Sequence, residues 1–89
     1  MNKDRRKAIA KITDQLDELR GMMDNIRQAI EDIKDEEQEY HDNMPEAFQQ
    51  GEKGDAAQTA IDALDNAAME FDNLNLDDIT SYLDEAAGV

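Results

Sequence analysis

The chain of 89 residues carries 23 acidic and nine basic residues, which gives a formal net charge of −14 at pH 7. A chain of this length allows one small domain with a single core of marginal stability. The absence of cysteine excludes disulfides, thiolate metal sites and a cysteine nucleophile. The negative field disfavours nucleic acid and anionic membranes as partners and favours basic protein surfaces.

The first eleven residues differ from the rest of the chain, because they carry a net charge of +4. They lead into no apolar signal segment, and no apolar run approaches the ~18 residues that a membrane span needs. The sequence therefore predicts a cytoplasmic protein with no membrane partner.

One heptad register runs from Ile9 to Tyr40, with seam residues alternately three and four apart and mostly charged or amide residues between them. Four or more heptads of this kind predict a long helix, about residues 5–41, with a narrow coiled-coil seam that another element must cover. The predicted seam consists of Ile9, Ile12, Leu16, Leu19, Met23, Ile26, Ile30 and Ile33, followed by Glu37 and Tyr40.

The end of this helix is the densest acidic segment of the chain. Glu37 and His41 lie one helical turn apart, which is a spacing that two metal ligands can have. The segment lacks the spaced acids and the glycine of a calcium loop, and it lacks the Glu-x-x-His pair of bundle di-metal sites. We therefore expect no metal and a solvated acidic face, formed by Asp35, Glu36, Glu37, Glu39 and Asp42.

Pro45 marks the connection, because proline disfavours a helical conformation in the residue before it. The sequence predicts a connection over residues 42–54, with a short helical turn after Pro45 that Gly51 closes. Met44 and Phe48 are expected to fold back as an apolar plug on the end of the core.

A second helix is predicted over about residues 55–87, where Asp55 and Gln58 form a start similar to a capping box after Gly54. Its register slips at Leu74-Asn75-Leu76. The slip implies a helix kinked or broken near residues 73–76, and we favour a continuous helix with a local distortion over a break that Asn75 recaps. Two apolar stripes run along it: Ala57, Ile61, Leu64, Ala68 and Phe71 form the first, and Ala56, Ala60, Ala63, Ala67 and Leu74 form the second.

Two helical segments of equal length and a compact connection predict an all-α fold, a coiled-coil-like antiparallel helical hairpin that forms one domain over residues 1–89. The hairpin would bring the basic N-terminus, including Arg6, near Asp84 and Glu85. The second stripe would remain exposed in a monomer. Either a second copy, which gives a homodimeric four-helix bundle, or a partner protein would cover it.

A motif around the connection resembles one in small uncharacterised phage-encoded acidic helical proteins. The resemblance covers roughly residues 35–70 and implies a helical hairpin and a phage setting, so that the cytoplasm would be that of the host cell. It assigns no functional residues. The matching residues are Glu39-Tyr40-His41-Asp42-Asn43-Met44-Pro45-Glu46, then Gly51-Glu52-Lys53-Gly54 and the Ala-Ile-Asp-Ala-Leu heptads.

The sequence does not indicate an enzyme. It has a single histidine, no Ser/His/acid arrangement at a plausible spacing and no glycine-rich phosphate loop, so we expect neither catalysis nor a cofactor. Two non-enzymatic functions remain. In the first, the carboxylates imitate DNA phosphates and occupy the nucleic-acid site of a basic host protein, which is inhibited or modulated during counter-defence or host takeover. In the second, an interaction or assembly module binds through the alanine-rich stripe, and the acids only solvate the surface.

The charge density is comparable with that of a DNA strand, and the phage resemblance favours the first of these functions over the second. A hairpin ~50 Å long with fourteen net charges has one charge per ~3.6 Å, close to the ~3.4 Å of a single DNA strand. The predicted acidic partner-binding residues are Asp35, Glu36, Glu37, Glu39, Asp42, Asp62, Asp65 and Asp72. The predicted apolar partner or dimer surface consists of Ala56, Ala60, Ala63, Ala67 and Leu74.

Overall fold

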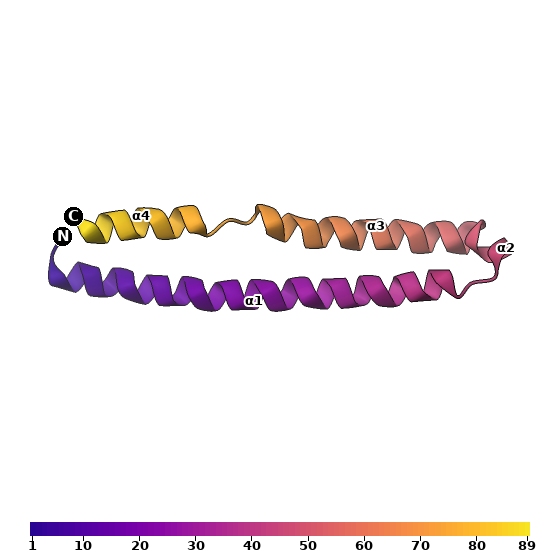
Figure 1. The fold of residues 1–89 in the computed structure, drawn as a ribbon, viewed down its shortest axis with the longest axis horizontal. Coiled ribbons are helices and arrows are strands. Elements are labelled where there is room, and N and C mark those ends of the chain that lie inside the picture. Colours follow the sequence, from indigo (N-terminus) through magenta and orange to yellow (C-terminus); the bar gives the residue numbers. More distant parts are fainter. The chain divides into compact units, whose positions relative to one another are not determined.

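The computed structural model describes all residues from Met1 to Val89 and is 88% helical, without strands. The predicted all-α class is confirmed. Figure 1 shows the helices in chain order, and their bounds are α1 Lys3–Asp42, α2 Glu46–Gln49, α3 Glu52–Asn73 and α4 Asp77–Gly88.

The chain divides into two compact units. The terminal unit comprises Met1–Asp24 and Leu74–Val89, and the central unit comprises Asn25–Asn73. The terminal unit therefore holds the first part of α1 together with α4. The central unit holds the rest of α1 together with α2 and α3.

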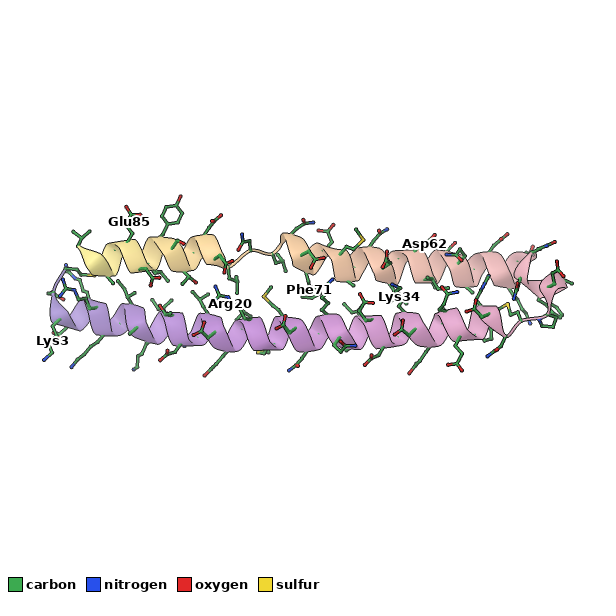
Figure 2. The ribbon with its side chains drawn as sticks, in the orientation of Figure 1. Lys3, Arg20, Lys34, Asp62, Phe71 and Glu85 are labelled. Carbon is green, nitrogen blue, oxygen red and sulfur yellow. The ribbon has the colours of Figure 1, made fainter.

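The central unit has a small core that α3 contributes. Ala57, Ile61 and Ala68 are buried, and Ala68 has no exposed surface. Leu64 and Phe71 are half-buried, and Figure 2 shows Phe71 directed toward α1. The first predicted stripe of the second helix is therefore the face that packs inside this unit.

The inward face of α1 differs from the predicted seam. In the central unit its half-buried positions include Arg27, Ile30, Lys34 and His41. The intervals between them are three, four and seven residues. The predicted seam is thus correct only in alternate members, because polar residues take the other inward positions. The remaining seam residues of this unit are exposed, namely Ile26 (46%), Ile33 (53%) and Tyr40 (54%).

The terminal unit repeats this pattern. Thr13, Leu16 and Arg20 are half-buried, whereas Ile12 and Leu19 are exposed. On both parts of α1, therefore, the residues one position before the polar inward positions form an uncovered apolar row.

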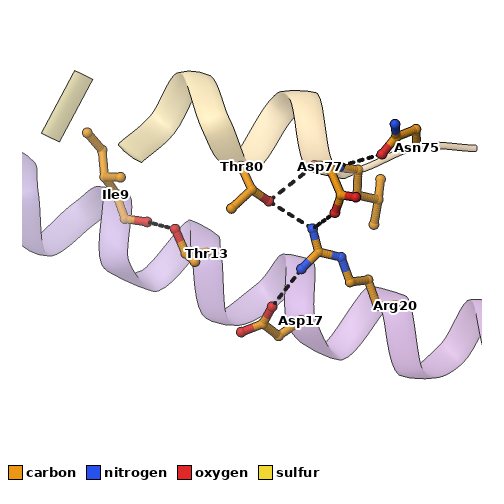
Figure 3. Close-up of polar contacts among 8 residues, drawn as sticks. Ile9, Thr13, Asp17, Arg20, Asn75, Asp77 and Thr80 are labelled. Carbon is orange, nitrogen blue, oxygen red and sulfur yellow. Dashed lines mark hydrogen bonds and ion pairs between the residues drawn. The ribbon is translucent and has the colours of Figure 1, made fainter. Parts of the chain in front are cut away.

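Arg20 joins the two segments of the terminal unit (Figure 3). Its Nη1 lies 3.1 Å from Asp17 Oδ1, and its Nη2 donates to Asp77 Oδ1 at 2.9 Å and to Thr80 Oγ1 at 3.1 Å. The guanidinium fork thereby contacts a carboxylate on α1 and two side chains of α4, a geometry that lysine cannot reproduce.

The basic N-terminus contacts the end of α4, but not through the expected carboxylates. Arg6 Nε donates to the backbone oxygen of Ala87 at 3.0 Å, and the amino group of Met1 donates to the oxygen of Val89 at 2.6 Å. No ion pair involves Asp84 or Glu85. The cations instead satisfy carbonyl oxygens that the last turn of a helix leaves open.

The second helix is broken rather than continuous, so the favoured distortion was wrong. α3 ends at Asn73 and α4 begins at Asp77, whose backbone N–H donates to Asn75 Oδ1 at 2.8 Å. Leu74 and Leu76 are two residues apart, so one continuous helix would point them about 200° apart. The break lets Leu76 become half-buried while Leu74 remains 55% exposed.

The connection is also shorter than predicted. α3 begins at Glu52, so Gly54 lies inside the helix and is buried instead of ending the loop. A Cβ on Gly54 would collide with the carbonyl group of Gln49 and would lie 2.6 Å from the Gln49 Cα. Only glycine allows α2 and α3 to approach this closely.

Candidate functional site

The negative charge is concentrated in the central unit. Residues 25–73 include fourteen acidic and three basic residues, a net charge of −11. The terminal unit has nine acidic and six basic residues, a net charge of −3. The negative field is therefore strongest around the central unit.

Two of the three basic residues of this unit are held in ion pairs between α1 and α3. Lys34 Nζ lies 2.8 Å from Asp65 Oδ1, and Arg27 forms a two-pronged contact with Asp72, with Nη1–Oδ1 at 2.7 Å and Nη2–Oδ2 at 3.2 Å. Figure 2 shows Lys34 directed from α1 toward α3. Asp65 and Asp72 are therefore already paired, unlike the open carboxylates that the sequence predicted.

The environment of Lys34 stabilises its charge. The hydrogen bond to Asp65 raises the pKa of the Lys34 amine above its usual value of 10.5, an effect that desolvation opposes. The negative charges of Asp65 and Glu31 also raise this pKa, and Glu31 Oε2 lies 3.6 Å from Nζ. Lys34 is thus a fixed cation between the helices at neutral pH.

The order of these ion pairs along the chain shows the relative direction of the two helices, from which the sides of the central unit follow. Arg27 pairs with the later residue Asp72 and Lys34 with the earlier Asp65, so the two helices run antiparallel within this unit. From a contact between two antiparallel helices, turning by the same angle about each helix axis, in the direction in which its residues advance, leads to the same side of the helix pair. The two ion pairs have nearly the same angular position around the helices, since residues seven apart return to within about 20°.

The acidic side of the central unit, as we define it, consists of Asp35, Asp42, Asp55 and Asp62. Each lies about 60–100° beyond the ion pairs in the same sense, and all four are exposed. Gln38 Nε2 donates to Asp42 at 3.0 Å, and Gln58 Nε2 donates to Asp62 at 2.9 Å. These amide contacts orient the carboxylates without neutralising them.

The predicted acidic cluster of α1 does not meet on one side. Consecutive residues of a helix point 100° apart. Glu39, four residues after Asp35 and three before Asp42, therefore borders the acidic side that these two form, whereas Glu36 points away from it. Glu37 is half-buried among the inward positions. Sequence proximity alone therefore overstated this cluster.

The apolar side of the central unit lies opposite the acidic side, because its residues are turned from the ion pairs by about 80–160° in the other sense. It consists of Ile26, Ile33 and Tyr40 on α1 and of Ala60 and Ala67 on α3. The predicted residues Ala56 and Ala63 are exposed farther out on α3, and Leu74 belongs to the terminal unit. The sequence predicted that these residues of α1 lie in the covered seam, so their exposure is a correction.

A signal for this exposed row was present in the sequence. Arg27, Lys34 and His41 each follow a member of the row and share its spacing of seven residues. Asp65 and Asp72 on α3 have the same spacing. Pairing the basic row of α1 with the acidic row of α3 predicts the orientation of α1 that the structure shows.

A hollow of about 270 Å³ lies at the α1–α2 connection. Phe48 is 53% exposed, so it does not form the predicted plug, and Lys53 Nζ lies 5.8 Å from the centre of its ring. Gln49 Nε2 instead closes this end by donating to the backbone oxygens of His41 and Met44 at 3.2 and 3.1 Å. The hollow is lined by Tyr40, Asn43, Met44, Pro45, Phe48 and Lys53.

No three potential ligands among the His, Asp and Glu side chains come together to hold a metal ion. None of the helices combines the length and apolar character that crossing a membrane requires. Comparison with known proteins finds no matching family model, no matching curated protein and no matching solved structure. The candidate site therefore rests on the geometry of the central unit.

Proposed function

We propose that this chain is a non-enzymatic, phage-type acidic protein that binds a basic host protein and inhibits or modulates it by DNA mimicry. The observation that supports this proposal is the central unit, with a net charge of −11 and an acidic side on which four carboxylates are exposed. The cations of Arg27 and Lys34 are committed to α3 and do not offset the charge of this side.

Charge density supports the same function. The part of α1 in the central unit, residues 25–42, spans roughly 27 Å at 1.5 Å per residue. Eleven net charges over this length amount to one per about 2.5 Å, between the ~1.7 Å of duplex DNA and the ~3.4 Å of one strand. A protein surface that binds DNA phosphates would meet a comparable field here.

The proposal extends to the arrangement of the full chain, for which we retain the antiparallel hairpin. Small-angle scattering at low protein concentration tests it, because a hairpin limits the largest dimension to about the 60 Å length of the 40-residue α1. A much larger dimension for the monomer would contradict the hairpin and leave the charge of the central unit unchanged.

The test of mimicry is competition with DNA. Immobilised protein is incubated with lysate of the host, and the bound proteins are challenged with a short DNA duplex or with salt. We expect the duplex to release the partner, and we expect retention to fall steeply between about 50 and 200 mM salt.

A matched pair of variants then locates the interaction. Neutralising the acidic side (Asp35→Asn, Asp42→Asn, Asp55→Asn and Asp62→Asn) should abolish retention of the partner that DNA displaces. The control removes the same number of charges from the terminal unit (Asp14→Asn, Asp78→Asn, Asp84→Asn and Glu85→Gln). Mimicry by the central unit is wrong if both variants retain the partner as well as the wild type does, at unchanged helicity.

The second candidate function, an assembly or interaction module, is favoured by a different observation, the exposed apolar residues of the central unit. In that function the acids only solvate the surface. Retention of a partner that is insensitive to salt and to DNA would favour it.

A further inference from the structure

We propose that the apolar side of the central unit binds the same side of a second copy of this chain. The row of large residues on α1 of one copy would pack against the row of alanines on α3 of the other copy. This surface is separate from the acidic side, so the inference goes beyond the proposed mimicry.

Large apolar side chains of α1 are exposed at a regular spacing. Ile26, Ile33 and Tyr40 are each about half exposed and lie seven residues apart on one helix. Scattered single apolar residues are normal on a protein surface, but a contiguous row marks an interaction site. A helix face with this period is suited to another helix, because knobs recur every seven residues along a coiled coil.

The apolar side is also complementary in shape to itself. A two-fold dimer uses the same patch on both copies, so the patch must contain both projecting and recessed parts. Here the large residues of α1 lie beside the small residues Ala60 and Ala67 of α3, and both rows repeat every seven residues. A two-fold axis parallel to the helices sets the large row of each copy against the small row of the other.

Charge limits where a second copy can bind. Two chains of −14 repel each other, so they can approach only where charge is low. Helical positions place Lys53 in line with the alanine row, seven residues before Ala60, and place three acids, Glu36 on α1 and Glu52 and Glu70 on α3, only at the outer edge of the apolar side. A basic partner would find no concentration of carboxylates on this side, whereas a second copy would leave all acidic sides in water.

The test measures the mass of the full-length protein by sedimentation velocity over a range of concentrations. We expect wild type to reach twice its 10.1 kDa monomer mass. Raising the salt concentration should strengthen this dimer, since salt screens repulsion between the two copies. The mimicry interaction has the opposite salt dependence, so failure of one proposal is distinguishable from failure of the other.

The decisive variant is Ile26→Gln combined with Ile33→Gln, which removes apolar surface without adding charge. We expect the dimer dissociation constant to rise at least about a hundredfold, because each change is counted twice in a two-fold dimer. The matched control is Met69→Gln, which alters an exposed apolar residue on the ion-pair side of α3 and should leave the dimer intact. Circular dichroism verifies that all variants remain helical.

A second measurement does not depend on the stability of the double variant. The chain has no cysteine, so Ile33→Cys and Ala67→Cys proteins can be mixed and joined by a short bismaleimide. We expect the mixture to give more cross-linked dimer than the Met69→Cys protein alone. The proposal is overturned by a wild type that stays monomeric at several hundred micromolar in high salt, by a dimer unaffected by Ile26→Gln with Ile33→Gln, or by equal cross-linking through Met69→Cys.

Discussion

Lys34 Nζ lies 2.8 Å from Asp65 Oδ1, and this contact places a cation at an inward position of α1 next to the exposed Ile33. Arg27 and Asp72 repeat the arrangement one heptad away. The pairs orient α1 so that only alternate members of its apolar seam face α3. These two ion pairs therefore both neutralise two acids on α3 and leave the apolar row of α1 uncovered.

The Lys34–Asp65 pair predicts a loss of stability at high pH. The folded state raises the pKa of Lys34 above its usual value of 10.5, so the pair stabilises the fold fully below 10.5 and less as pH rises through the raised value. Thermal unfolding between about pH 9 and 12 should therefore show a steeper loss for wild type than for Asp65→Asn. Equal slopes would show that the contact does not hold the proton in solution.

The two helical glycines Gly54 and Gly21 should respond in opposite ways to alanine. Gly54→Ala places a methyl group against the backbone of Gln49, which cannot change rotamer, so we expect a loss of about 1–3 kcal/mol. Gly21→Ala meets nothing within 4 Å and should stabilise α1 by up to ~1 kcal/mol. Urea unfolding measures both changes. A stabilising Gly54→Ala would contradict the close approach of α2 and α3.

The break between α3 and α4 predicts a specific role for Asn75. Its side chain accepts the N–H of Asp77, so Asn75→Ala should destabilise the start of α4 by about 1 kcal/mol. Amide exchange of Asp77 should accelerate in this variant. Asn66→Ala, within α3, is the control and should have little effect or a slight stabilising one. Unchanged exchange at Asp77 would argue for a helix that continues through residues 74–76.

Two alanines of α3 should differ sharply when enlarged. Ala68 is completely buried, so Ala68→Leu should overpack the central unit and cost about 1–3 kcal/mol. Ala63 is exposed, and Ala63→Leu should leave the free energy of unfolding nearly unchanged. Chemical denaturation at low micromolar concentration keeps self-association out of the comparison. Equal costs for both would mean that α3 is rotated from its observed orientation.

The candidate site was only partly predictable for a geometric reason. Asp35, Glu36, Glu37 and Glu39 are close together in the sequence, but a helix distributes neighbouring residues around its axis. The sequence also predicts open carboxylates at Asp65 and Asp72. Their pairing depends on which residues of α1 lie opposite, and this information belongs to two segments at once.

The sequence by itself determined the all-α class, the length of α1, the stop at Pro45 and the inward stripe of α3, because periodicity, proline and alanine content act locally. Only the tertiary structure decided the rotation of α1, the burial of Gly54 and the choice of a break over a kink after Asn73. Each of these depends on how separate helices pack against one another, and for Gly54 these are the neighbouring helices α2 and α3. A heptad pattern with both apolar and oppositely charged rows allows more than one rotation, and Lys34 and Arg27, opposite Asp65 and Asp72, select one of them.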